Sequence, residues 1–298
     1  MPSNLRDRLR LIQGHKKAEP ARHDSPRLSV FLDKGWASCG YLALKREVFL
    51  SAPVEIPARL PEALPILIPD LSRGAPPLPE DFLFFDLETT GLSGGAGTVA
   101  FLAAFGKIVS SGKLLVTQYL LLDYPGENDF LDAALGEFQN ERAVITSYNG
   151  KCFDSPLLAA RCLMNGKTPP EYRHADLLHP ARRLWKTITN DCSQKSVEMN
   201  ILKYDRGGDV PGALAPEIWF DFLRTGDAGR LFGICDHNVS DIAGLASILA
   251  AIIQIAADPF ADKYPFDRGR LALRWRDYIR RVYAQRAPCP RPPEKLAE

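Results

Sequence analysis

Apolar runs and amphipathic stretches alternate through the middle of the chain. Five runs are short, rich in branched and aromatic residues and bounded by turn residues, which is typical of buried strands. In chain order these predicted strands cover residues 82–86, 98–109, 113–123, 142–150 and 172–178. Only Ser-Ser-Gly separates the second from the third, so these two should form an antiparallel hairpin.

Stretches with helical periodicity follow the hairpin and alternate with the later strands. They cover residues 130–141, 155–166, 193–204, 215–225 and 236–257. Asn165-Gly166 is a typical C-terminal stop for the second of these helices. A three-stranded meander followed by helix, strand, helix and strand predicts an α/β domain, in which a mixed five-stranded sheet carries helices on both faces.

The regions before and after this α/β pattern differ from it in composition and in the elements that they predict. Eight of the 24 prolines fall within residues 53–79, which excludes a long helix there and indicates a connecting segment. Residues 28–52 before it predict short strands, and residues 270–286 predict an amphipathic helix that mixes Arg with aromatic residues. We therefore expect three parts: an N-terminal extension with short strands and a proline-rich linker, a central domain, and a C-terminal basic helix with a disordered tail. Their predicted ranges are 1–80, 81–257 and 258–298.

Bulk composition narrows the function classes. The net charge of +1 excludes a protein that coats nucleic acid with general positive charge, so any such contact must come from local patches. None of the six cysteines forms a CxxC pair, which favours reduced, packed cysteines and a cytoplasmic location. The longest apolar run, residues 242–257, is shorter than the roughly 18 residues of a membrane span, so we expect no membrane contact.

Acidic residues stand at the ends of the predicted strands and on one predicted helix. Asp86 and Glu88 lie two positions apart on a strand, so their side chains should share one face. Asp154 begins a helix that follows the strand ending at Asn149-Gly150. In the helix 236–257, His237 and Asp241 lie four residues apart and should face the same way.

Four converging acids repel one another unless cations lie among them. Oxygen ligands select hard ions such as Mg²⁺ or Mn²⁺, and two such ions activate water at a phosphodiester. A nearby His237 could accept the water's proton. Each residue also has a structural alternative: Asp154 as a helix cap, Asp241 as the buried partner of an Arg or Lys, and His237 as a satisfied core histidine.

The sequence resembles a known family through three separated motifs. DLETTG, SYNGKCFDSPLL and HNVSD, in this order, resemble the motifs of the DEDD exonuclease group in the ribonuclease H-like superfamily. Further stretches, ADLLHPARRLWK and DVPG among them, resemble its YprB-like branch, and the match covers about residues 80–257. The resemblance implies a ribonuclease H-like fold and a site for two Mg²⁺ or Mn²⁺ ions.

The resemblance also implies residue roles. The implied metal ligands are Asp86, Glu88, Asp154 and Asp241, and the groups implied to face the terminal nucleotide are Thr89, Thr90, Gly91 and Asn149. One departure concerns the general base, which in the histidine subgroup lies five residues before the last Asp. His237 lies four before Asp241, where the tyrosine subgroup has Tyr, and this spacing turns it by about 100° on a helix.

The predicted function is a metal-dependent 3′-5′ exonuclease acting on single-stranded DNA or RNA. The alternatives are a catalytically weak or inactive ribonuclease H-like module that binds nucleic acid, and a phosphatase acting on small nucleotides. A fifth acid, Asp176, could join the site, but a supporting or structural role is favoured, and Glu198 is expected to pair with Arg206. The basic residues Arg182, Arg183 and Lys186 would either hold phosphates or form a solvated helix face.

Overall fold

The computed structural model describes residues 26–51, 56–91, 97–109, 112–259, 263–267, 277–278 and 280–281. In this part of the chain seven strands form one mixed sheet, in the order β1-β2-β5-β4-β3-β6-β7. Their bounds are β1 Trp36–Gly40, β2 Ala43–Ser51, β3 Phe82–Thr89, β4 Ala100–Val109, β5 Lys113–Leu121, β6 Val144–Ser147 and β7 Arg173–Asp176. β3, β6 and β7 run parallel, and the other neighbours are antiparallel.

The five predicted strands are confirmed as β3 to β7, and the hairpin of β4 and β5 is confirmed as well. The predicted number of strands in the sheet was wrong. β2 pairs with β5 along its whole length, from Ala43 opposite Leu121 to Ser51 opposite Lys113, and β1 pairs with β2. The strands expected in residues 28–52 therefore extend the central sheet, because β5 offers them an otherwise unpaired edge.

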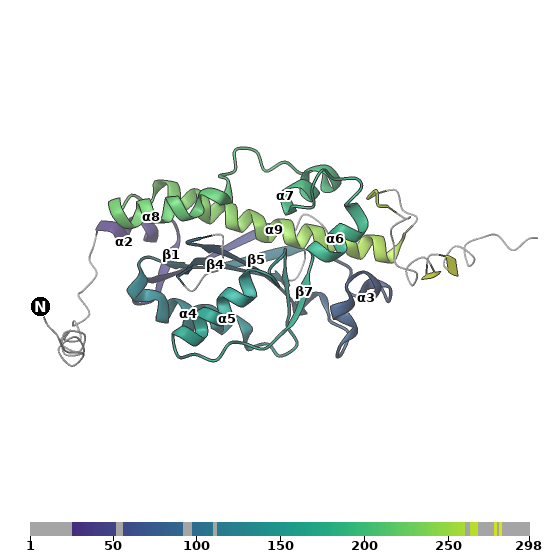
Figure 1. Cartoon of the computed structure of the whole chain (residues 1–298), viewed down its shortest axis with the longest axis horizontal. Helices are drawn as coiled ribbons and strands as arrows, with labels where there is room; N and C mark the ends of the chain where they lie inside the picture. The colour runs from purple at the N-terminus through teal and green to yellow at the C-terminus, as the bar shows by residue number, and fades with distance from the viewer. Residues whose placement is uncertain are drawn as a thin grey trace, which may run out of the picture.

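The helices cover both faces of the sheet, as predicted. Their bounds are α2 Pro26–Leu32, α3 Leu64–Leu67, α4 Glu127–Leu135, α5 Asp154–Met164, α6 Leu178–Trp185, α7 Gln194–Val197, α8 Ala215–Thr225 and α9 Gly229–Ala257. Helices α6 to α9 lie on one side of the sheet, and α4 and α5 lie on the other (Figure 1). The predicted helix over 193–204 is interrupted, because a π-helical turn, Glu198–Leu202, follows α7 and ends at the left-handed Lys203.

Side-chain alternation in β3 connects the fold to the acids. Phe82 and Phe84 belong to the core that packs against α9, whereas Leu83 and Phe85 belong to the core on the opposite face. Because successive side chains of a strand alternate, the even-numbered acids of β3 continue the row of Phe82 and Phe84. Both acids of the strand therefore face α9.

Helix α9 is the main element packed on this face. It begins seven residues before the predicted start, and its first turns contain Gly233, whose missing side chain makes room for Val210. By length and composition it is long and apolar enough to cross a membrane, but 72% of its apolar window is buried inside the fold. Burial against the sheet accounts for its apolar character.

Several expectations lie outside the described residues. These are most of the C-terminal helix over 270–286 and the tail from Ala287. The five cysteines that the structure describes are free.

Candidate metal centre

Asp86 and Glu88 lie near the end of β3 and point toward α9. Asp86 is held by a chain of polar side chains: Asn238 Nδ2 donates to Asp86 Oδ2 at 2.7 Å, and Gln118 Nε2 donates to Asn238 Oδ1 at 2.9 Å. Arg46 in turn donates to Gln118 Oε1 at 2.7 and 3.1 Å. Asn238 and Gln118 are fully buried, so this network fixes the direction of the Asp86 carboxylate.

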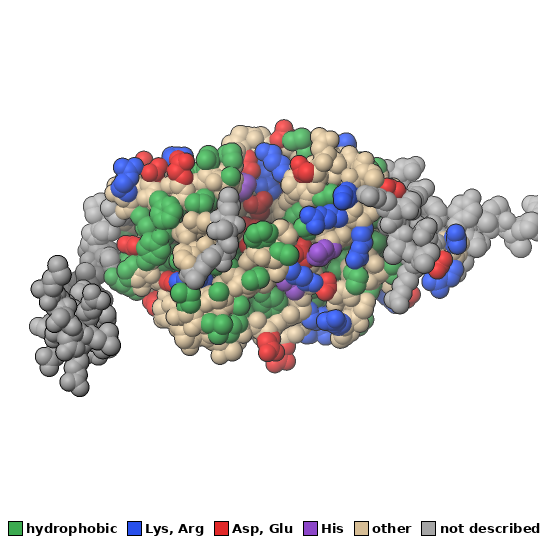
Figure 2. Space-filling view, in the orientation of Figure 1, with side chains coloured by type: hydrophobic (Ala, Val, Ile, Leu, Met, Phe, Trp, Pro, Cys, Tyr) green, Lys and Arg blue, Asp and Glu red, His purple; other side chains and the backbone are tan. Residues whose placement is uncertain are grey.

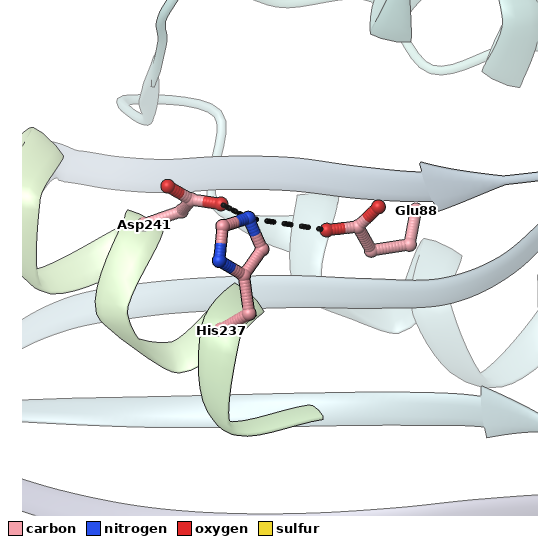
Figure 3. A group of neighbouring side chains, drawn as sticks. All are labelled: Glu88, His237 and Asp241. Atoms are coloured by element: carbon pink, nitrogen blue, oxygen red, sulfur yellow. Dashed lines mark ion pairs between the residues drawn. The ribbon is translucent and has the colours of Figure 1, made fainter. Parts of the chain in front are cut away.

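Helix α9 brings His237 and Asp241 to the same place. His237 Nε2 lies 3.2 Å from Asp241 Oδ2 and 4.0 Å from Glu88 Oε1. One ligand atom from each of the three lies within 4.8 Å of the others, so Glu88, His237 and Asp241 could hold a metal ion. Figure 3 shows the imidazole of His237 between the carboxylates, with Nε2 directed at both.

Asp154 is the first residue of α5, as predicted. The residue before the helix, Phe153, makes no capping hydrogen bond. The loop needs a glycine at position 150, because a Cβ there would lie 2.8 Å from Asp154 Oδ2 and would also collide with Ser147. The loop between β6 and α5 therefore packs tightly around the Asp154 carboxylate.

Asp176 holds this loop in place through hydrogen bonds to its backbone. Its buried carboxylate accepts hydrogen bonds from the backbone N–H groups of Asn149, Lys151 and Leu178, at 2.8 to 3.1 Å. Asn149 is in the left-handed region, with φ 66°. Asp176 thus has the structural role expected of it, since it joins the end of β7 to the loop that carries Asp154.

The negative charges of the four acids raise the pKa values of three of them. Burial, followed by the charges of Asp241, Asp154 and Glu88, raises the pKa of Asp86 well above its usual value. Burial and the charges of Asp241 and Asp154 do the same to the pKa of Glu88. The pKa of Asp154 rises to about 7 through burial and the charges of Asp176 and Asp241. Carboxylates whose negative charges oppose one another in this way are suited to bind hard divalent cations.

Two side chains of the chain itself already contact Asp241. Arg206 Nη1 lies 2.7 Å from Asp241 Oδ1, and His237 Nε2 lies 3.2 Å from Asp241 Oδ2. Arg206 also binds Glu198 through two hydrogen bonds of 2.6 Å, in a pair that is almost completely buried. The expected pairing of Glu198 with Arg206 is confirmed, and Asp241 also has the buried arginine partner considered as its alternative.

Asp209 is part of the site, although no role was predicted for it from the sequence. Its Oδ2 lies 2.8 Å from His237 Nδ1 and 3.5 Å from Arg206 Nη1. The only signal in the sequence was its place in the DVPG motif, because Asp209 comes from a segment without regular secondary structure. Arg46, Gln118 and Asn238 also had no predicted role.

The turn after β3 uses several of its own polar groups. Thr89 Oγ1 donates to Gly91 O at 2.9 Å, and Thr90 exchanges two hydrogen bonds of 2.9 Å with the backbone of Val99. These bonds fix the shape of the turn directly after Glu88. Contacts of Thr89, Thr90, Gly91 and Asn149 with a substrate stay a prediction.

A basic surface lies on the helix that follows β7. Arg182 and Arg183 of α6 and Lys186, directly after it, are exposed, and Arg183 donates a hydrogen bond to the carbonyl of Leu67. In Figure 2, acidic side chains lie in a hollow of the displayed face, and Lys, Arg and His side chains gather to the right of it.

The chain belongs to the RNase H superfamily, whose family model matches residues 83–253. Over 171 residues it is 37% identical to YprB of Bacillus subtilis (strain 168), an uncharacterized protein. This match covers 56% of the chain and 41% of YprB, so the chain spans less than half of that relative. The resemblance to the superfamily and to its YprB-like branch, which the motifs predicted, is confirmed.

Two solved structures to which the chain is similar have low sequence identity to it. The zinc-bound complex of E. coli exonuclease I with single-stranded DNA is 16% identical, with a TM-score of 0.39, and the match covers 60% of this chain and 41% of that one. The family B DNA polymerase of Pyrobaculum calidifontis is 15% identical, with a TM-score of 0.42, over 58% of this chain and 24% of the polymerase.

Proposed function

We propose that this protein is a metal-dependent nuclease that hydrolyses phosphodiester bonds at the 3′ ends of single-stranded DNA or RNA. The observation that carries the proposal is the gathering of four carboxylates, in which the charges of Asp154 and Asp241 raise the pKa of both Asp86 and Glu88. The four carboxylates are those of Asp86, Glu88, Asp154 and Asp241. Membership of the RNase H superfamily supports a role in nucleic-acid processing.

The four acids would hold two Mg²⁺ or Mn²⁺ ions. Bound there, the ions would supply Lewis-acid stabilisation of the attacking and leaving oxygens of the phosphodiester. Asn238 would keep the Asp86 carboxylate turned toward the site through its 2.7 Å hydrogen bond. The loop fixed by Asp176 would do the same for Asp154.

His237 would accept the proton of the attacking water as the general base. Its Nε2 atom already lies next to Glu88 and Asp241, at 4.0 and 3.2 Å, so a water close to these carboxylates would be within its reach. The one-residue difference in spacing from the histidine subgroup does not turn the ring away from the acids, because Nε2 faces them from the preceding turn of α9 (Figure 3).

The substrate would approach over the turn after β3 and the basic surface of α6. The backbone around Thr89 to Gly91 and that of Asn149 would face the terminal nucleotide. The exposed side chains of Arg182 and Lys186 would contact phosphates further along the strand. Such contacts do not depend on base identity, which suits a nuclease with little sequence preference.

Cleavage of 5′-labelled single-stranded DNA and RNA oligomers with Mn²⁺ tests the proposal. Wild-type protein should produce a ladder that shortens from the 3′ end, and Asp86→Asn should abolish it. Asp33→Asn removes a charge from an exposed side chain and should leave the ladder unchanged. Wild-type protein that binds no divalent ion and cleaves neither oligomer would refute the proposed activity.

A second candidate is a nucleic-acid-binding module with little or no activity. The contact of Arg206 with Asp241 favours it, because it gives this carboxylate a cationic partner from the protein itself. This candidate predicts that the wild type binds the oligomers as tightly with EDTA as with Mn²⁺ and leaves them intact.

A further inference from the structure

The two ring nitrogens of His237 face different partners. Nδ1 lies 2.8 Å from Asp209 Oδ2, whereas Nε2 faces Asp241 and Glu88 (Figure 3). The side chains of His237 and Asp209 are 14% and 9% exposed, so water competes little for the bond between them. The ring is therefore held at one nitrogen and presented to the acids at the other.

The nearer carboxylate decides where a neutral imidazole carries its proton: Nδ1 is hydrogen-bonded to Asp209 at 2.8 Å, whereas Nε2 lies 3.2 Å from Asp241 with no hydrogen bond described between them. An ionised carboxylate only accepts hydrogen bonds, so the bond to Asp209 needs the proton on Nδ1. In a neutral imidazole the lone pair is then on Nε2, the nitrogen next to Glu88 and Asp241. This is the tautomer that a general base acting on a water at these carboxylates requires.

We propose that Asp209 is a positioning residue that fixes the tautomer and the ring orientation of His237. The inference rests on the proposed nuclease function, in which His237 is the general base. Asp209 would not touch the substrate or the ions; it would act only through the imidazole.

The segment that carries Asp209 is itself anchored. Arg206, three residues earlier, is bound to the buried Glu198 by two hydrogen bonds and contacts Asp209 at 3.5 Å. Gly212, three residues later, lies close to the ring, because a Cβ there would lie 2.9 Å from His237 Nε2. A side chain at 212 would push the ring away, so one end of this short segment is fitted to the imidazole and the other is held by Glu198.

Nitrogen NMR of the full-length chain tests the tautomer without any cleavage. In ¹⁵N-histidine-labelled protein with Mg²⁺ at pH 8.5, the His237 resonances are those absent from His237→Ala. The wild type should show a protonated Nδ1 and an unprotonated Nε2, and Asp209→Ala should shift the population toward the Nε2–H form. A wild type that already has the proton on Nε2 would overturn the inference.

Kinetics then tests whether Asp209 acts through His237. With saturating Mn²⁺ and a single-stranded oligomer, Asp209→Asn should lower kcat about 10- to 100-fold and change KM less than about threefold, as expected for loss of an orienting partner. The control Asp205→Asn changes an exposed carboxylate of the same segment and should leave kcat unchanged.

The decisive comparison is made in the His237→Ala background. There Asp209→Asn should cause no further loss, because the group through which it acts is gone. An equal loss in both backgrounds, or an unchanged kcat in the single variant, would overturn the inference. An inactive wild type that nevertheless shows the Nδ1–H tautomer would refute the nuclease and leave the role of Asp209 in orienting the ring intact.

Discussion

Replacing Asp154 with Asn should stabilise the metal-free protein while damaging its site. The carboxyl ionises near its usual pKa of 3.8 in the unfolded chain and at about 7 in the folded one, because burial and the charges of Asp176 and Asp241 oppose ionisation. Between these pH values the folded chain binds more protons than the unfolded chain. The free energy of unfolding of the wild type therefore falls as pH rises through this window.

The size of the effect follows from the shift. A difference of about three pKa units, at about 1.36 kcal/mol each, destabilises the wild type by at most about 4 kcal/mol at pH 8. At pH 5 the same relation gives about 2 kcal/mol, because the folded carboxyl is then protonated. Asp154→Asn has nearly the same shape and no charge, so its advantage over the wild type should roughly double between pH 5 and pH 8.

Urea denaturation in EDTA at several pH values measures this advantage. Asp33→Asn serves as the control, because its side chain is exposed, and it should change the free energy of unfolding by less than about 0.5 kcal/mol at every pH. With saturating Mn²⁺ the wild type should be more stable than Asp154→Asn, since only the wild type has the complete set of metal ligands. An Asp154→Asn variant no more stable than the wild type at pH 8, or an advantage independent of pH, would refute the electrostatic reasoning.

Three further predictions concern the surroundings of the site. Glu198→Ala should destabilise the protein by about 3 kcal/mol in urea denaturation, because it leaves the guanidinium of Arg206 buried without its main partner; an unchanged midpoint would contradict this. Gly150→Ala should lower Mn²⁺ affinity about tenfold in calorimetric titration, since its Cβ displaces the Asp154 carboxylate; wild-type affinity would show that the loop adapts. At pH 8, Mn²⁺ should raise the Tm of the wild type and EDTA should reverse the rise, whereas a Tm indifferent to both would argue against a cation site.

Much of the fold could be predicted because its signals are local. The apolar runs of β3 to β7 and the periodicity of α5 and α8 each identify an element without knowledge of its neighbours. The strands before the proline-rich segment were also visible, but their partner was not. Pairing of β2 with β5 joins residues about seventy positions apart, and nothing in either strand alone specifies the other.

Some residues of the site also have a local signal in the sequence, and others do not. Asp86 and Glu88 stand out because acids interrupt an apolar strand, and His237 and Asp241 because they share a helix face. Asp209 gave no comparable signal, since an acid in an irregular segment is usually solvated and only the folded chain brings it to the imidazole.

The supporting amides were missed for a related reason. Gln118 is a polar residue in a mostly apolar strand, which indicates a buried hydrogen bond but not its partner. Its connection to Asp86 through Asn238 depends on how α9 crosses the sheet, which local sequence patterns do not contain.

Anomalous scattering from crystals grown with Mn²⁺ and a short single-stranded oligomer tests the central claim most directly. We expect two manganese peaks, separated by ~4 Å and bounded by Asp86, Glu88, Asp154 and Asp241, with the 3′-terminal phosphodiester beside them. The absence of manganese from these carboxylates, with Arg206 still paired with Asp241, would contradict a metal-dependent nuclease and leave the binding module.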